Sequence, residues 1–386
     1  MTSTIRPIYL DYNGTTPIDP EVIEAMRPFL ETEFGNPSSS HWYGIVPKQA
    51  IEDAREKVAR LLHCKPANVL FTSGGTESNN HAILGAARAL SHRGRHLVTS
   101  AVEHPAVLEV CKSLAREGFE TTIVPVDGKG RVNPEDVERA LRSDTILVSI
   151  MHANNEVGTI QPIAEIGAMV RQRNIVFHTD AAQSVGKTEV DVETLGVDLL
   201  SVAGHKLYAP KGIGVLYIRT GIELEKFCHG AGQERGLRAG TENVPYIVAL
   251  GKACEIAHRD LKANIEYMQT AADRLAEGIF NRLTDVRRNG DGSNGLPNTV
   301  SLSFRGLEAN RILEEIGLRV AASAGAACHS DSVKISHVLE AMGIEEEWAK
   351  GTIRFSVGRK TRIKEVDEAV DVVVQAVTRM APFRKR

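Results

Sequence analysis

The chain has 386 residues, 42% of them hydrophobic, with 33 glycines and a formal net charge of −3; these values are typical of a soluble α/β protein with two domains, or one large domain and a lobe. Charges of both signs are interspersed, which excludes a basic stripe for nucleic acid and a polybasic anchor for a membrane. The start has no secretion signal, and the five scattered cysteines form no CxxC pair, so we expect a cytoplasmic protein with reduced thiols.

The predicted elements alternate between helix and strand over the first two thirds of the chain. Residues 47–62 place Ile51, Ala54 and Val58 on one helical face. Seven β-rich runs follow, separated by helical stretches: NVLFTS, HLVTSAV, TTIVPV, TILVSIM, IVFHTD, VDLLSVAG and IGVLYI. This alternation favours a mainly parallel sheet that helices cover on both faces.

A long helical run begins near residue 245 and has no glycine between 252 and 277. It is compatible with two packed helices or with one spine that joins two lobes. Strands and helices after this run, including NTVSLSFRG and GTIRFSVGR, suit a smaller α+β lobe. The sequence therefore predicts a second unit toward the carboxyl end of the chain.

A lysine and an aspartate come at the ends of two of the predicted strands. Lys206 follows Gly204 and His205, where an amine can have its pKa lowered for Schiff-base chemistry; a surface charge is the alternative. Asp180 ends an earlier β-rich run and could instead cap a helix. Together they offer what pyridoxal phosphate requires, namely an amine for its aldehyde and a carboxylate for its pyridine nitrogen.

Three further strand ends carry residues that suit the same cofactor. Thr76 follows a Gly-Gly turn that opens a helix, which is a suitable cradle for a phosphate group. His104 could stack on a flat ring or move protons, and Asn155 could bond a ring hydroxyl. Taken singly, each is as compatible with an ordinary loop, turn or structural histidine. Their convergence with Asp180 and Lys206 indicates one site for a phosphorylated pyridine ring.

Nine segments of the chain together resemble those of one known family. The segments LDYNGTTP, FTSGGTESNN, EHPAVL, ANNEVG, HTDAAQSVGK, GHKLYAPKGIGVLYI, QERGLRAGTEN, GAACHSD and IRFSVGR resemble cysteine desulfurases of the NifS/IscS type, in the same order and nearly end to end. The resemblance implies a fold-type-I transferase that depends on pyridoxal phosphate. Its fold would be α/β, with a mainly parallel seven-stranded sheet between helices and a smaller α+β lobe. We expect a large domain over residues 15–260 and a small domain over 1–14 and 261–386.

The resemblance also implies roles for individual residues, with no metal. The catalytic residues would be Cys328 as sulfur-accepting nucleophile, Lys206 as Schiff-base lysine and His104 as the ring-stacking, proton-handling group. The cofactor would be held by Gly75, Thr76, His104, Asn155, Asp180, Gln183, His205, Lys206 and, from the partner subunit of a homodimer, Thr241. The substrate carboxylate would be held by Arg354 with support from Asn13 and Asn36, since the arginine fork binds a carboxylate at two points.

The segment around Cys328, SAGAACHSD, consists mostly of small residues. A packing cysteine would prefer large apolar neighbours, and a zinc ligand would need a second cysteine nearby, so an unobstructed nucleophile is the better interpretation. His329 and Asp331 either distinguish sulfur from selenium or merely lead into the next helix. The sequence departs from many relatives at Ala203, where they carry a serine that would bond the phosphate.

The activity implied is conversion of L-cysteine to L-alanine, with sulfur held by Cys328 as a persulfide. A sulfur-acceptor protein would then use it for iron-sulfur cluster assembly or tRNA thiolation. Because the residues after Cys328 resemble those of selenocysteine lyases, release of selenium from L-selenocysteine is the alternative. Two other classes of protein are possible. An aminotransferase would keep its turnover after loss of the Cys328 thiol. A binding protein that keeps only the fold would fail to bind pyridoxal phosphate.

Overall fold

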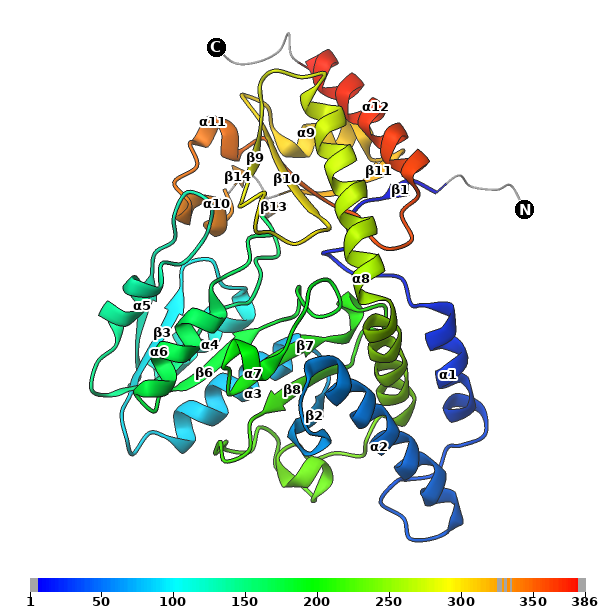
Figure 1. Cartoon of the computed structure of the whole chain (residues 1–386), viewed down its shortest axis with the longest axis vertical. Helices are drawn as coiled ribbons and strands as arrows, with labels where there is room; N and C mark the ends of the chain where they lie inside the picture. The colour runs from blue at the N-terminus through cyan, green and yellow to red at the C-terminus, as the bar shows by residue number, and fades with distance from the viewer. Residues whose placement is uncertain (1–5, 325–327, 330–331, 334, 381–386) are drawn as a thin grey trace.

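The computed structural model describes residues 6–324, 328–329, 332–333 and 335–380 (Figure 1). A seven-stranded sheet with its helices forms the larger part, and a four-stranded sheet forms the smaller part above it in this view. Within the described ranges, no helix combines the length and the apolar character that crossing a membrane requires.

The large sheet has the strand order β2-β8-β7-β6-β5-β3-β4. Its strands are Val69–Thr72 (β2), His96–Ser100 (β3), Glu120–Val124 (β4), Thr145–Ser149 (β5), Val176–Asp180 (β6), Leu199–Ala203 (β7) and Gly214–Ile218 (β8). Strand β8 runs antiparallel to both of its neighbours, and the other pairs are parallel. The mainly parallel seven-stranded sheet predicted from the sequence is confirmed.

Helices bury both faces of this sheet. They are Pro20–Glu31 (α1), Trp42–Leu62 (α2), Gly75–Ala89 (α3), Pro105–Ala115 (α4), Pro134–Ala140 (α5), Ile163–Gln172 (α6) and Val192–Leu195 (α7). Successive strand residues point into opposite cores: Leu199 packs with α3 and α4, whereas Leu200 packs with α2, α6 and the helix Val244–Phe280 (α8). Both faces of the sheet are therefore apolar, as expected for parallel strands covered by helices.

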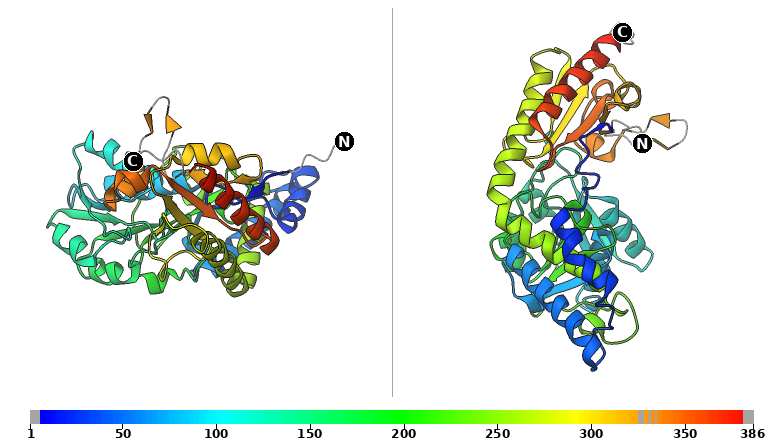
Figure 2. Two further views of the ribbon diagram at one scale, coloured as in Figure 1. Left: turned by 90° about the horizontal axis from the view of Figure 1, so that it is seen from above. Right: turned by 90° about the vertical axis from the view of Figure 1, so that its right-hand side faces the viewer.

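Helix α8 (Val244–Phe280) joins the two parts of the molecule. It is one continuous helix of 37 residues, which decides between the two structures that the sequence allowed. Its first half, with Leu250, packs in the core of the large sheet, and its last turns, with Leu275, pack in the core of the small one. Figure 2 shows α8 running along one side of both parts. The domain boundary predicted at residue 260 lies between these two packed stretches.

The small sheet has the order β12-β15-β10-β9 and is antiparallel. Its strands are Val286–Asn289 (β9), Thr299–Phe304 (β10), Ser323–Ala324 (β12) and Thr352–Ser356 (β15), and its helices are Ala309–Ile316 (α9), His337–Ala341 (α10), Glu346–Ala349 (α11) and Ile363–Met380 (α12). Near the start of the chain, Ile8–Tyr9 (β1) pairs with Val320–Ala321 (β11), so this segment belongs to the small part. Strand Cys328–His329 (β13) pairs with Ser332–Val333 (β14).

Short 3-10 turns complete the chain at Pro66–Asn68 (η1), Gly204–Lys206 (η2) and Gln233–Gly236 (η3). Turn η2 is important for the site, because it follows β7 directly and so places Lys206 at the carboxyl end of a central strand. The loops that follow the parallel strands of the large sheet thus lie at the carboxyl ends of those strands, on the side that faces the small part.

Candidate active site

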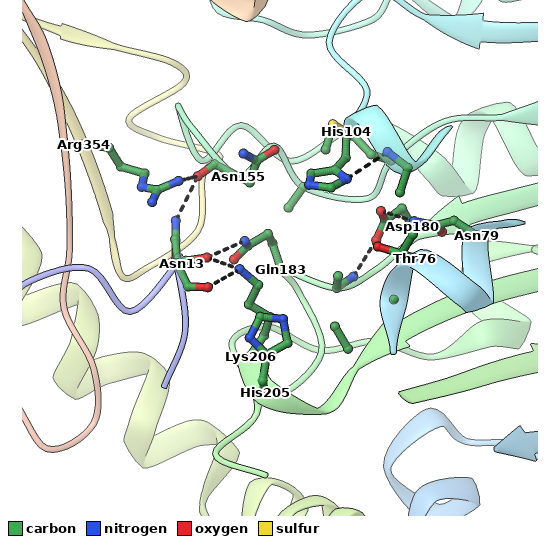
Figure 3. A pocket seen from close by; sticks show the side chains of 17 residues that line it. Asn13, Thr76, Asn79, His104, Asn155, Asp180, Gln183, His205, Lys206 and Arg354 are labelled. Carbon is green, nitrogen blue, oxygen red and sulfur yellow. Dashed lines mark hydrogen bonds between the residues drawn. The ribbon is translucent and has the colours of Figure 1, made fainter. Parts of the chain in front are cut away.

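A cavity of about 260 Å³ lies at the carboxyl ends of the parallel strands (Figure 3). The five strand-end residues singled out from the sequence, Thr76, His104, Asn155, Asp180 and Lys206, all line it. Twelve further residues complete the lining: Asn13, Gly14, Gly75, Asn79, Ala106, Met151, Ala153, Ala182, Gln183, Ala203, His205 and Arg354. The structure therefore brings together most of the predicted site.

Lys206 projects into this cavity from turn η2. Its Nζ donates hydrogen bonds to the backbone oxygens of Asn13 and Gly14, the second at 2.7 Å. Burial, together with the positive charge of Arg354, lowers the pKa of Lys206 to about 8. A minor fraction of the Lys206 side chains, larger than for an ordinary lysine, is consequently a neutral amine near neutral pH, which is the form that attacks an aldehyde.

Asp180 is the last residue of β6 and is 6% exposed. Its Oδ2 accepts a hydrogen bond of 2.6 Å from Asn79 Nδ2, and its Oδ1 accepts one of 2.9 Å from the Ala182 amide. The residues after Asp180 form turns, so the alternative in which it caps a helix is wrong. Sequence analysis missed Asn79, although it lies one helical turn beyond Thr76 on α3 and so faces the same way.

The start of helix α3 provides a phosphate-sized cradle. Its N-cap is Gly74, which offers no side-chain cap to the first turn, and the amide groups of a first helical turn lack intrahelical partners. A Cβ at Gly75 would lie 3.1 Å from the Cβ of Ala203, so any larger residue there would narrow the cradle. His205, bonded to Thr15 Oγ1 at 3.1 Å, borders it as a neutral ring, because burial and Lys206 lower the pKa of His205 to about 4.

His104 lies just before helix α4 and lines the cavity. Its Nδ1 accepts a hydrogen bond of 3.1 Å from the Ala106 amide, so Nε2 is the nitrogen left for other partners. Burial is the main cause that lowers the pKa of His104, which favours the neutral ring. A neutral imidazole with a defined tautomer suits both stacking and proton transfer.

Glu103, next to His104, is completely buried and was missed by sequence reasoning. Its Oε1 accepts hydrogen bonds from Ser100 Oγ at 2.6 Å and from the Met151 amide at 2.9 Å, while Oε2 has no partner among the described residues. Burial raises the pKa of Glu103 to about 8, so this side chain is mainly protonated at neutral pH. It thereby adds little negative charge beside Asp180.

Arg354 enters the cavity from strand β15 of the small sheet. Its two terminal nitrogens donate to the Asn155 backbone oxygen at 2.9 Å and to Asp11 Oδ1 at 2.7 Å. Its Nε is buried and has no partner among the residues the structure describes. Asn13, 1% exposed, donates from Nδ2 to the same Asn155 oxygen at 3.3 Å. The guanidinium is the cationic group that the small part contributes to the cavity.

Three predicted residues are not brought into this cavity within one chain. Asn36 and Thr241 are exposed and do not line it; Asn36 Oδ1 accepts from the Ser38 amide at 2.9 Å. Cys328 lies on β13, but its side chain is outside the described part of the structure. Gln183 does line the cavity and donates from Nε2 to the Asn13 backbone oxygen at 3.0 Å. The roles assigned to these four residues, like those of the other residues predicted for the site, remain predictions.

The donor set fits pyridoxal phosphate. The amine of Lys206 would hold the aldehyde carbon, Asp180 the pyridine nitrogen, and the amides at Gly75 and Thr76 the phosphate. Arg354 lines the same cavity, and its Nε has no partner among the described residues, so its guanidinium offers a cationic group for a second anion, such as an amino acid carboxylate. When bound, the cofactor supplies an electron sink for a carbanion at the amino acid's α-carbon.

The chain is similar to known proteins along nearly its whole length. The family profile described as "Aminotransferase class-V" matches residues 8–369. A protein of Dictyoglomus turgidum named "Cysteine desulfurase IscS" is 48% identical over 384 residues, which cover 98% of each chain. Among solved structures, a "NIFS-LIKE PROTEIN" superposes with a TM-score of 0.91 at 38% identity, covering 97% of this chain and 100% of the other. The structure described as "SspA in complex with cysteine" has a TM-score of 0.82 at 39% identity, covering 92% of this chain and 100% of the other.

Proposed function

Since the chain belongs to the aminotransferase class-V family, whose relatives here are pyridoxal phosphate enzymes, we propose that it is a cysteine desulfurase that converts L-cysteine to L-alanine. The observation that carries the proposal is the meeting of Lys206 and Asp180 with Arg354 in one small cavity. The first two residues suit the cofactor, and the third suits the carboxylate of an amino acid. The names of the relatives supply the choice of cysteine.

Four residues would act on L-cysteine in the proposed reaction. The Arg354 guanidinium binds the substrate carboxylate and orients the α-carbon toward Lys206. Lys206 Nζ removes the α-proton and later returns a proton, which a pKa of about 8 allows in both directions. The Cys328 thiolate attacks the substrate sulfur; an S–S bond forms, the substrate C–S bond breaks, and the electron pair of that bond stays with the three-carbon fragment that becomes alanine. His104 Nε2 handles protons near the departing sulfur.

We propose further that the enzyme works as a homodimer. A group of apolar side chains on and around helices α1 and α2 is exposed to an unusual degree: Leu30 (62%), Phe34 (76%), Trp42 (70%), Tyr43 (54%) and Ile45 (58%). Exposed clusters of this kind mark protein interfaces. A homodimer is also what the predicted role of Thr241, as a phosphate ligand from the partner subunit, requires.

Light scattering on the Trp42→Glu variant tests the dimer. We expect wild-type protein at twice the chain mass and the variant shifted toward the monomer, with loss of bound cofactor. Leu318, which is 90% exposed but outside this group, provides the control, and Leu318→Glu should remain dimeric. A wild-type protein that scatters as a monomer would contradict the proposal.

The sulfur held by Cys328 would pass to an acceptor protein for iron-sulfur cluster assembly or tRNA thiolation. We also propose a cytoplasmic location, because a persulfide carrier requires a reducing compartment and the described cysteines Cys64, Cys111, Cys228 and Cys254 are free thiols.

The substrate is tested by measuring alanine released from L-cysteine and from L-selenocysteine under reducing conditions. We expect sulfide and alanine in equal amounts from L-cysteine, with a comparable or higher kcat/KM than for L-selenocysteine. Turnover of L-selenocysteine alone would contradict the proposal and identify a selenocysteine lyase. Amino transfer to a keto acid that survives Cys328→Ala would identify an aminotransferase.

A further inference from the structure

A second lysine lies buried beside the cavity. Lys187, 5% exposed, follows the turn after β6. Its Nζ donates hydrogen bonds to Gln183 Oε1 at 2.8 Å and to Asn13 Oδ1 at 3.0 Å. Both of these acceptors are amide oxygens and neither is a carboxylate. A buried ammonium group without a counter-ion is strongly disfavoured, so this environment requires an explanation.

The donor count of Lys187 is consistent with a neutral amine. Burial, and the positive charges of Lys206 and Arg354, lower the pKa of Lys187 well below its usual value. A neutral amine has two N–H groups, and the two amide oxygens accept both. Lys187 is therefore satisfied as a hydrogen-bond donor without contributing a charge to the site.

Lys187 Nζ donates to the oxygen end of each amide, so the nitrogen end of each amide is turned away from Lys187. With Oε1 of Gln183 turned toward Lys187, the Nε2 group of Gln183 is turned the other way, toward the Asn13 backbone oxygen at 3.0 Å and the cavity. Asn13 is fixed in the same manner: its Oδ1 also accepts from Asn298 Nδ2 at 3.0 Å, while its Nδ2 donates to Thr299 Oγ1 at 2.8 Å. Figure 3 shows Asn13 and Gln183 together beside Lys206.

We propose that Lys187 is a positioning residue that holds the Gln183 amide so that it presents an N–H group, and not a carbonyl oxygen, to the ring oxygen of the cofactor. This inference rests on the proposed cofactor site. An amide N–H stabilises an oxygen anion, whereas an amide carbonyl repels it. Lys187 thus lowers the pH at which the bound cofactor loses its proton, although Lys187 does not contact the cofactor.

Charged and titratable groups around the ring also affect this pH and must stay constant in a test. The charged groups are Asp180 at the end of β6, Lys206 in η2 and Arg354 on β15, and the titratable rings beside them are His205 in η2 and His104 before α4. A change at Lys187 leaves all five in place. A shift caused by Lys187→Met can therefore be assigned to the amide that it holds.

The test is a pH titration of the visible absorbance of cofactor-loaded protein. Lys187→Met removes both donated hydrogen bonds at similar volume, and we expect the pH midpoint of the absorbance change to rise by about one unit, since the ring oxygen loses a donor. Gln183→Leu should raise the midpoint by a similar amount, and the double variant should show no further rise. Lys187→Gln, which keeps an N–H donor, should restore much of the wild-type midpoint.

A matched control separates positioning from simple loss of buried hydrogen bonds. Asn68 is 8% exposed, does not line the cavity, and donates to the Ile218 backbone oxygen at 2.7 Å and to Thr220 Oγ1 at 3.0 Å. Asn68→Leu should lower stability and leave the midpoint unchanged. An unchanged midpoint in Lys187→Met, or in Gln183→Leu should the lysine variant fail to fold, would overturn the inference. The readout requires bound cofactor but no sulfide release, so its failure is distinguishable from failure of the proposed desulfurase activity.

Discussion

The two sheets of the molecule contribute to the cavity in different ways. The seven-stranded sheet supplies Asp180, Lys206 and His104 from the ends of different strands, whereas the four-stranded sheet supplies Arg354 from the middle of β15. Parallel strands all end at the same edge, so their loops meet there; antiparallel strands end alternately at opposite edges. The large sheet can therefore assemble a cofactor site, and the small sheet adds Arg354, the group that we propose binds the substrate carboxylate.

The two sheets also differ in the titratable side chains that they bury. In the large sheet, His178 is bonded to Ser149 Oγ and Ser201 Oγ, and burial lowers the pKa of His178 to about 3. The core of the small sheet is built from apolar side chains such as Leu302 and Phe355. We therefore expect the catalytic groups and the pH-sensitive groups to lie mainly in the large sheet.

The largest effect is expected from Lys206→Ala. Without the amine in η2, the protein should lose its visible cofactor band and at least about a thousandfold in kcat, because covalent cofactor attachment and proton transfer are both removed. Lys211, an exposed lysine on the following loop, is the matched control, and Lys211→Ala should keep the band. A normal band in Lys206→Ala would refute the assignment of the large sheet as the cofactor site.

Cys328→Ala should abolish sulfide release from L-cysteine while leaving the cofactor band intact. The thiol is needed for sulfur transfer and is not part of the cofactor cradle, so spectrum and activity should separate in this variant. Cys254, buried in α8, serves as the control, and Cys254→Ala should retain sulfide release. Sulfide produced by Cys328→Ala at the wild-type rate would exclude Cys328 as the nucleophile.

An intermediate effect is expected from Arg354→Lys, which replaces the forked donor by a single ammonium. We predict a rise in KM for L-cysteine of about tenfold to a hundredfold with a smaller change in kcat, since substrate binding is weakened while the cofactor site is kept. Arg359, also from the small part, pairs with Asp19 at 2.7 Å outside the cavity lining. Arg359→Lys should lower thermal stability and leave KM unchanged; an equal rise in KM for both variants would contradict a specific role for Arg354.

The smallest effect concerns pH and stability. Burial raises the pKa of Glu103 from 4.5 to about 8 in the folded protein. Between these two pH values the carboxyl group ionises in the unfolded chain but stays protonated in the folded one. The stability that the protonated group contributes is therefore complete below pH 4.5 and is lost as the pH rises toward 8. The free energy of unfolding should decrease from pH 5 to pH 8 in the wild type, and in Glu103→Gln this decrease should be smaller by about 1 kcal/mol or more, because glutamine does not ionise. Urea unfolding at the two pH values measures this. Equal falls in wild type and variant would show that Glu103 is ionised in the folded protein.

Much of the fold and of the cavity could be predicted from sequence. The strands of the large sheet are short apolar runs bounded by turns, and polar residues at their ends necessarily gather at one edge. The NifS/IscS resemblance is confirmed by the comparisons. Whether the run after residue 245 bends could not be predicted, because helical periodicity is the same for one helix or two.

The residues that sequence analysis missed share a physical feature. Asn79, Glu103 and Lys187 are buried polar groups whose partners come from other segments: Asn79 bonds Asp180, Glu103 bonds Met151, and Lys187 bonds Asn13. A hydrogen bond between residues distant in sequence leaves no local pattern. Such groups can be identified only when the folded arrangement shows which polar atoms meet.

The central claim, that η2 presents Lys206 as the covalent attachment point, is tested most directly by borohydride reduction of cofactor-loaded protein followed by peptide mapping in a mass spectrometer. Lys206 is partly buried and lines the cavity, whereas Lys187 is buried beside the cavity and does not line it. We predict that the reduced cofactor is found on the peptide that contains Lys206. Recovery of the modification on Lys187 would contradict the account.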